Sequence, residues 1–214
     1  NAGMAMCLAV GQGYLWCGTG SGAGDGLAAG LDGKIYRIRP GVDTAWILDA
    51  TFSLSETPIS LCSYKGQMYA GTHRDTTDEG RLLKRAVAGT WASVATTGGV
   101  PTTGGSRIGS LVVFGENLYF HSVNFQGASS TSKIRKYNNT TASDQYTIAL
   151  AAGNEPQLPG NSFAIGGKLY FLVNVDDGSY ASGKAIWSSD GSSFTELTGS
   201  PVATNIGRAG ILVT

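Results

Sequence analysis

The sequence has no excess of charge of either sign. Its 214 residues include 15 basic and 15 acidic side chains, and charged residues make up only 14% of the chain. Binding to nucleic acid or to an anionic membrane requires a clustered basic surface, which this balance does not supply. No apolar run approaches the roughly 18 residues that a membrane-spanning helix needs. We therefore expect neither a nucleic-acid partner nor a membrane partner.

Cysteine is scarce, and helical periodicity is nearly missing. Cys7, Cys17 and Cys62 have no C-x-x-C spacing, so neither a zinc site nor a dense disulfide framework is indicated. Their apolar surroundings are typical of buried thiols, although a Cys7–Cys17 bridge across one hairpin stays open. No apolar period of 3.6 residues runs longer than a turn or two. We expect almost no helix, no cofactor and no metal.

Glycine, by contrast, is abundant, with 32 residues that predict many tight turns. Four glycine- or glutamate-led segments align without gaps: GYLWCGT, GQMYAGT, ENLYFHS and GKLYFLV. The alignment places Trp16, Tyr69, Tyr119 and Tyr170 in register, at intervals of 53, 50 and 51 residues. A period near 50 residues indicates a repeat architecture.

Each copy of the repeat contains three further segments. An apolar run precedes the hairpin, a strand with a basic residue near its start follows it, and an aromatic-led segment comes last. Such short runs of β-branched and aromatic residues, bounded by turn residues, predict four antiparallel strands, A to D. The aligned basic residues are Lys34, Arg81, Lys133 and Lys184, and the aligned aromatic residues are Trp46, Trp91, Tyr146 and Phe194.

Four strands in about 50 residues is the spacing of a β-propeller blade. The sequence therefore predicts an all-β fold, a β-propeller of four-stranded antiparallel blades. Four blades are visible, together with the first strand of a fifth, in a single domain or domain segment that spans residues 1–214. The predicted blades cover residues 4–53, 58–98, 106–152 and 161–200, and the extra strand covers 206–214.

One turn carries a family resemblance. The stretch WSSDGSSF, from Trp187 to Phe194, resembles the Asp-box of sialidase-like propellers, although it is one residue short and ends in Phe194 in place of Trp. The resemblance implies a structural turn formed by Ser188, Asp190, Gly191 and Phe194. A short Asp side chain readily accepts backbone N–H bonds, and we expect that role for Asp190.

The extra strand has consequences for partners. An apolar first strand without a hairpin partner is an exposed edge, which proteins avoid leaving bare. We therefore expect a protein partner, or further chain, to complete the ring, with a glycan as another candidate ligand.

The B–C and D–A loops are long and fall on one face of the predicted disc, which makes that face the candidate contact surface. Its titratable cluster surrounds His73, its paired aspartates could bind a hard cation, and its aromatic residues could stack on a sugar ring. The candidate residues are His73, Arg74, Asp75, Asp78, Asn124, Phe125, Asp176, Asp177 and Tyr180.

Three functions compete at the level of sequence. A sialidase-like glycoside hydrolase would need an arginine cluster, and YRIRP at 36–40 resembles that family's arginine motif but lies on the third strand of its blade. Low charge and the lack of a catalytic constellation favour a protein that is not an enzyme. We expect a structural, assembly or recognition module, phage tail- or fibre-like or secreted, located outside the cell or in a virion. A lectin-like glycan-binding propeller is the alternative, and a glycoside hydrolase ranks third.

Overall fold

The computed structural model describes residues 4–20, 33–52, 56–74, 79–98, 105–124, 130–149, 155–176 and 182–197. Within these ranges the chain consists of strands and turns, with no helix, which confirms the prediction of an all-β fold. None of the described residues forms a helix that could cross a membrane.

The strands come in groups of four, which we call units 1 to 4. Unit 1 contains β1 (Met4–Gly11), β2 (Tyr14–Gly20), β3 (Lys34–Ile38) and β4 (Ile47–Thr51). Unit 2 contains β5 (Glu56–Tyr64), β6 (Gln67–Arg74), β7 (Arg81–Arg85) and β8 (Trp91–Thr96). Unit 3 contains β9 (Ser106–Phe114), β10 (Asn117–Asn124), β11 (Thr131–Tyr137) and β12 (Ala142–Thr147). Unit 4 contains β13 (Glu155–Ile165), β14 (Lys168–Asp176), β15 (Ser182–Ser188) and β16 (Thr195–Glu196).

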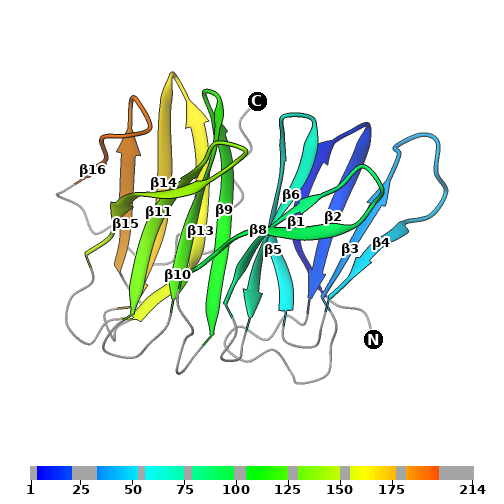
Figure 1. The fold of residues 1–214 in the computed structure, drawn as a ribbon, viewed down its shortest axis with the longest axis horizontal. Helices are drawn as coiled ribbons and strands as arrows, with labels where there is room; N and C mark the ends of the chain where they lie inside the picture. The colour runs from blue at the N-terminus through cyan, green and yellow to red at the C-terminus, as the bar shows by residue number, and fades with distance from the viewer. Residues whose placement is uncertain are drawn as a thin grey trace.

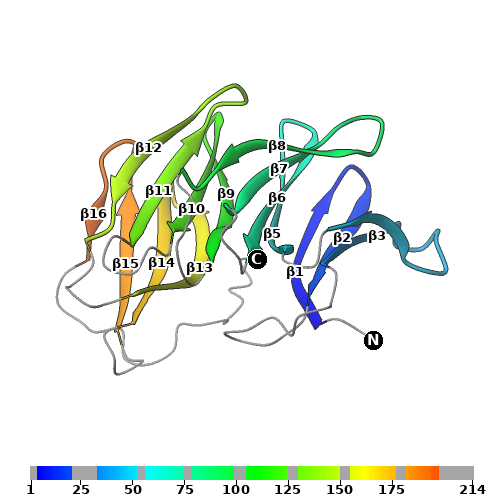
Figure 2. The ribbon, with the colours of Figure 1, turned by 60° about the horizontal axis from the view of Figure 1, so that its bottom comes forward.

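The units follow one another across the molecule, from unit 1 at the right of Figure 1 to unit 4 at the left. The same succession is visible in Figure 2, with β16 at one end and β3 toward the other. The first strands of successive units lie next to one another, since β1 contacts β5, β5 contacts β9, and β9 contacts β13.

The sequence predicted a separate sheet for each unit, and the structure differs from this prediction. Units 1 and 4 each form a four-stranded antiparallel sheet, but units 2 and 3 share one eight-stranded sheet. The two are joined where β6 pairs with β9, at His73 opposite Arg107 and Arg74 opposite Ser106. The division into four blades therefore stays a prediction.

The hairpins between first and second strands use left-handed backbone. Gln12 and Gly13 both have positive φ, 54° and 76°, and so do Lys65 and Gly66, at 48° and 72°. Two consecutive residues with positive φ match the twist of a two-residue hairpin, and glycine takes this conformation at little cost.

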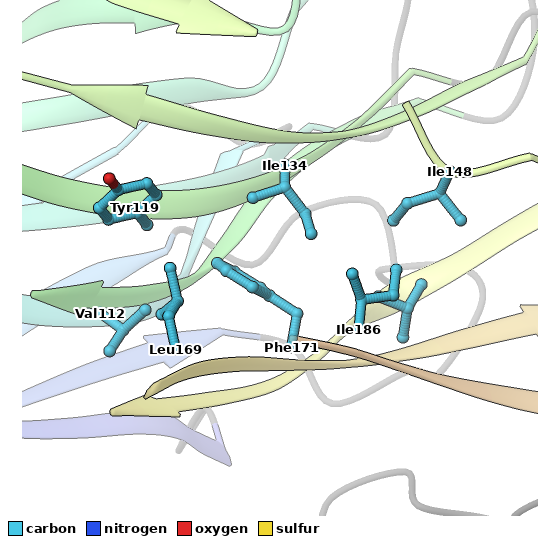
Figure 3. Close-up of a cluster of buried hydrophobic side chains, with 8 residues drawn as sticks. Val112, Tyr119, Ile134, Ile148, Leu169, Phe171 and Ile186 are labelled. Atoms are coloured by element: carbon cyan, nitrogen blue, oxygen red, sulfur yellow. The ribbon is translucent and has the colours of Figure 1, made fainter. Parts of the chain in front are cut away.

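Hydrophobic clusters fill the three junctions between units. Trp16, Tyr69 and Tyr119, which the repeat aligns, are at most 2% exposed, and each belongs to the cluster at the junction with the following unit. Figure 3 shows the junction of units 3 and 4, where Ile134 and Ile148 face Phe171 and Ile186. Tyr170, the fourth aligned residue, is only partly buried.

The cysteines are free thiols, so the Cys7–Cys17 bridge does not form. Cys7 packs against the cluster between units 1 and 2, and it lies opposite Gly18 across the hairpin. Burial raises the pKa of its thiol to about 12, so Cys7 behaves as a small apolar side chain, as the sequence indicated.

Candidate functional site

One edge of the sheets gathers polar residues from units 2 and 3. Because the strands are antiparallel, β5, β7 and β9 begin at the edge where β6 and β10 end. This edge, at the bottom of Figure 1, is the loop face of the sequence prediction. We call it the loop edge.

Glu56 lies at the centre of this group, as the first residue of β5, and is 1% exposed. The Arg81 guanidinium donates two hydrogen bonds to its carboxylate: Nε to Oε1 at 2.9 Å, and Nη2 to Oε2. Arg74, which is opposite Glu56 in the β5–β6 ladder, places Nε 3.9 Å from Oε2. Bidentate, charge-assisted bonds of this kind fix both partners in position.

The backbone around Arg81 is also fixed. Thr72 Oγ1 accepts a hydrogen bond from the Arg81 N–H at 3.0 Å and donates one to the Arg81 carbonyl at 3.2 Å. The preceding Gly80 N–H donates to Ser106 Oγ of unit 3. A side chain at Gly80 would meet the Thr72 carbonyl oxygen and the Arg107 nitrogen at 3.0 Å. A Cβ there would press on backbone atoms of both units, which favours glycine where units 2 and 3 touch.

His73 and Arg107 lie where β6 pairs with β9. They are opposite each other across β6 and β9, and they are 7% and 6% exposed. Directly opposed residues project to the same side of a sheet, with Cβ atoms roughly 5 Å apart. The pair lies one ladder position from Glu56 and Arg74, and because successive residues of a strand alternate faces, His73 and Arg107 project to the opposite face of the sheet.

The structure places the sequence-predicted loop-face residues unevenly. His73 and Arg74 lie at the loop edge beside Glu56, and Asn124, 4% exposed, ends β10 at the same edge. Asp176 ends β14 opposite Glu155. The remaining predicted residues lie outside the described residues: Asp75, Asp78, Phe125, Asp177 and Tyr180.

Sequence reasoning missed the pair of Glu56 and Arg81, and it missed Arg107 opposite His73. Arg81 was visible as one of the four aligned basic residues, but its partner lies 25 positions earlier. The signal available in the sequence was a lone acidic residue immediately before the apolar run of strand A.

The predicted structural turn lies between β15 and β16. Asp190 Oδ1 accepts the N–H groups of Ser192 and Ser193, each at 2.8 Å, and Ser188 Oγ donates to the same oxygen at 2.9 Å. The backbone N–H of Ser193, then that of Ser192, hold the pKa of Asp190 well below its usual range. Ser188 Oγ also accepts the Gly191 N–H at 2.8 Å.

This turn contacts unit 3. A Cβ at Gly191 would collide with the Tyr119 side chain, and the Phe194 ring lies 6.0 Å from the Tyr146 ring. The four residues Ser188, Asp190, Gly191 and Phe194 therefore lie in a turn that packs between units 3 and 4.

A second polar pair is fully buried in unit 3. His121 Nε2 lies 2.7 Å from Ser132 Oγ, and neither residue is exposed. Burial lowers the pKa of His121 to about 3, so the ring is neutral near pH 7. A serine beside a neutral histidine is the arrangement that activates a nucleophile, but no substrate reaches a pair with no exposed surface. We assign the pair to packing.

Within the described ranges, no three His, Cys, Asp or Glu side chains come together in a way that could hold a metal ion.

Comparison with known proteins identifies the fold. No protein-family model matches the chain, and no curated protein matches it in sequence. Among solved structures, a thermostable family-43 glycoside hydrolase matches over 94% of this chain and 74% of its own, with a TM-score of 0.53 and 12% identity.

A second match comes from a structural and mechanistic study of two prolyl endopeptidases. It covers 89% of this chain, with a TM-score of 0.50 and 14% identity, and this chain spans about a quarter, 25%, of that protein's length. Likeness at such identities establishes the fold, which is of the β-propeller type.

These neighbours correct the functional prediction. Both are enzymes, whereas we expected a non-catalytic structural, assembly or recognition module, with lectin-like binding as the alternative. That prediction is wrong: it treated the lack of a recognisable catalytic motif as an argument against catalysis. In this chain the charged residues of the loop edge come together only through strand pairing, so they form no contiguous motif that could be recognised in the sequence.

Proposed function

We propose that this chain is part of the β-propeller of a hydrolase, with units 1 to 4 as its blades, and that its substrate is a glycoside bound at the loop edge. The Glu56 carboxylate, buried at the start of β5 and held by Arg81 and Arg74, carries the proposal. The match to a glycoside hydrolase over most of both chains supports it.

The chemistry assigns Glu56 a specific role. Glycoside hydrolysis uses two carboxyl groups, one that protonates the leaving oxygen and one that acts as base or nucleophile. The Glu56 side chain is fully buried, so it would not touch the substrate, and its role would be to hold the guanidinium groups of Arg81 and Arg74, which are 33% and 18% exposed. These two groups would donate hydrogen bonds to hydroxyl oxygens of the sugar.

The reacting carboxyl groups would then come from other residues at the same edge. Glu155 is the first residue of β13, as Glu56 is the first residue of β5, and it is opposite Asp176 in the β13–β14 ladder. Glu79, just before β7, is the other candidate within the described residues.

The test is hydrolysis of a panel of chromogenic aryl glycosides, with a fluorogenic proline-containing peptide assayed alongside. Glu56→Gln keeps the shape of the side chain and removes its charge, and we expect a rate about a hundredfold lower because Arg81 and Arg74 would no longer be held in position. Glu155→Gln should give a loss that exogenous azide or formate partly rescues if Glu155 is the acid or the nucleophile.

Asp49 provides the matched control. It is also buried and paired with a guanidinium, since Arg85 donates to both of its oxygens at 2.8 Å, but it lies on the outer strand β4. Asp49→Asn should lower stability and leave the rate of the remaining folded protein unchanged. A wild-type chain that turns over no glycoside, or a Glu56→Gln variant with full activity, would contradict the proposal. Peptide turnover alone would reassign the substrate class.

A further inference from the structure

The turn between β11 and β12 carries a motif that the proposed function does not use. It reads Asn138-Asn139-Thr140-Thr141, and all four residues are exposed. The sequence Asn-x-Ser/Thr, in which x is any residue except Pro, is the acceptor for N-linked oligosaccharide. The turn therefore holds two overlapping acceptors, and no other stretch of the 214 residues has this sequence.

The side chain of Asn138 closes the turn. Its Oδ1 accepts the backbone N–H of Thr140 at 3.0 Å and that of Thr141 at 2.8 Å, and Thr141 Oγ1 donates to the same oxygen at 3.4 Å. The Asn138 N–H also donates to the Thr141 carbonyl oxygen at 3.2 Å. An Asn side chain that accepts the backbone N–H two residues on forms an Asx turn. The oxygen of the Asn138 carboxamide is thus held inside the turn by local bonds.

The nitrogen of the same carboxamide is the atom that would carry a sugar. No described residue accepts a hydrogen bond from Asn138 Nδ2. A sugar replaces one hydrogen on Nδ2 and leaves Oδ1 in place, so the bonds that Oδ1 accepts would persist. Asn138 can therefore be modified without loss of the turn.

Asn139 is placed differently, although it is the next residue and is also exposed. Its Oδ1 accepts hydrogen bonds from the Tyr69 hydroxyl and from Lys84 Nζ, each at 3.0 Å. Both partners belong to unit 2, and Tyr69 is fully buried. Because Nδ2 is bonded to the same carbon as Oδ1, a sugar on Asn139 would crowd unit 2. It would also disturb a partner of the buried Tyr69 hydroxyl, which is costly.

The turn lies at the edge of the sheet opposite the loop edge. Thr131, the first residue of β11, is opposite Asn124 at the loop edge, and β11 runs from there to Tyr137 before the turn begins. A glycan on Asn138 would therefore leave the loop edge open, so the modification neither requires nor prevents the proposed function.

We propose that the β11–β12 turn is a site of N-glycosylation and that Asn138 is the residue modified. An oligosaccharyltransferase would supply the oligosaccharide from a lipid-linked pyrophosphate donor. The bond from Asn138 Nδ2 to C1 of the first sugar forms, and the bond from C1 to the pyrophosphate oxygen breaks. The lipid pyrophosphate leaves, and the displaced Nδ2 proton passes to a base of the transferase. A chain modified in this way travels through a secretory pathway, and the bulky glycan covers the exposed turn.

The experiment is expression of the chain behind a cleavable signal sequence in cultured mammalian cells, followed by intact mass measurement. We expect one N-glycan per chain, removable by peptide N-glycosidase, which marks the site by converting the linked asparagine to aspartate. Peptide mapping should locate the mark at position 138. Thr140→Ala destroys the Asn138 acceptor and keeps the Asn139 acceptor, and the glycan should be lost. Thr141→Ala is the matched control, because it destroys only the Asn139 acceptor, and the glycan should remain.

Wild-type protein without a glycan would overturn the proposal. So would a glycan on Asn139, or a Thr140→Ala variant modified as fully as wild type. Each variant removes one exposed hydroxyl from the same turn. A difference in glycan content between the two therefore identifies the acceptor and does not reflect the folding of the chain.

Discussion

The junction of units 2 and 3 and the junction of units 3 and 4 differ at two positions of the repeat. At the first junction these positions are Gly71 and Gly80, and the β9 backbone lies directly on them. At the second they are His121 and Ser132, which hydrogen bond to each other and fill the same space. The glycine junction closes into one continuous sheet, whereas the side-chain junction does not.

This difference shows how a repeat can vary the way its copies join. Without a Cβ at either position, the first strand of the next unit can approach the backbone closely. The junction of units 1 and 2 also has glycine at both positions, Gly18 and Gly33, but its strands stay in separate sheets, so glycine permits the joined sheet without by itself producing it. With an imidazole and a hydroxyl there, β13 stays a separate strand, and its pairing with β14 shows two register shifts. The second junction then depends on aliphatic and aromatic packing, which predicts different sensitivities to substitution.

The largest effect is expected at the side-chain junction. Phe171 is fully buried there, against Tyr119 and Ile134. Phe171→Ala should lower the free energy of unfolding by about 4 kcal/mol, because truncating a buried ring loses transfer energy and leaves a cavity. Urea unfolding measures this directly. Leu172→Ala is the control, because this neighbouring residue is partly exposed, and it should cost about 1 kcal/mol. Equal losses would mean that the packing at this junction is not specific.

The glycine junction should respond to the addition of a single methyl group. Gly71→Ala would place its Cβ against the Ile108 carbonyl oxygen, a backbone atom that cannot swing aside. We expect a loss of about 3 kcal/mol, the upper part of the range for overpacking. Gly115→Ala, with φ of 57° and open space around it, should cost about 1 kcal/mol from backbone strain alone. A Gly71→Ala protein as stable as Gly115→Ala would show that the close approach of β9 is not required.

The smallest of these effects should appear as a pH dependence confined to the side-chain junction. The pKa of His121 falls from 6.5 to about 3 on burial, so the unfolded chain binds a proton more readily than the folded one. The stability is then fully present above about pH 6.5 and declines as the pH falls toward 3, by about 1.4 kcal/mol per pH unit.

Between about pH 7 and pH 5 the wild-type protein should therefore lose about 2 kcal/mol through this residue. The variant His121→Gln retains a polar partner for Ser132 and should lack that component. Urea unfolding of both proteins at the two pH values gives the difference. Parallel losses in the two proteins would show that His121 stays accessible to protons in the folded state.

The sequence predicted the strand content well because each strand and turn of the repeat is marked by the types of its own residues. Aromatic residues such as Tyr69 and Tyr119 align on second strands, and glycines with positive φ fall in the hairpins between first and second strands. The joining of units 2 and 3 was not predictable in this way. Glycine in a strand pattern indicates a turn or a weak strand as readily as a close approach, and only the register distinguishes them.

The charged group at the loop edge was hidden for a related reason. Glu56 and Arg81 are 25 positions apart, and Arg74 comes beside them only through the β5–β6 pairing. The sequence showed His73 and Arg74 within a charged run, which directed attention to the adjoining loop. The Glu56 carboxylate lies opposite Arg74 on the neighbouring strand, where no local sequence pattern points to it.

The ladder bonds between β6 and β9 also bear on how the molecule comes apart. Heat or denaturant cannot separate unit 2 from unit 3 without breaking the backbone hydrogen bonds between β6 and β9. The eight strands of units 2 and 3 should therefore unfold cooperatively. Units 1 and 4 have no such tie among the described residues, and their amides should exchange with deuterium by opening events that leave the middle intact. Units 1 and 4 would thus unfold first, and units 2 and 3 would remain folded as a partly unfolded intermediate.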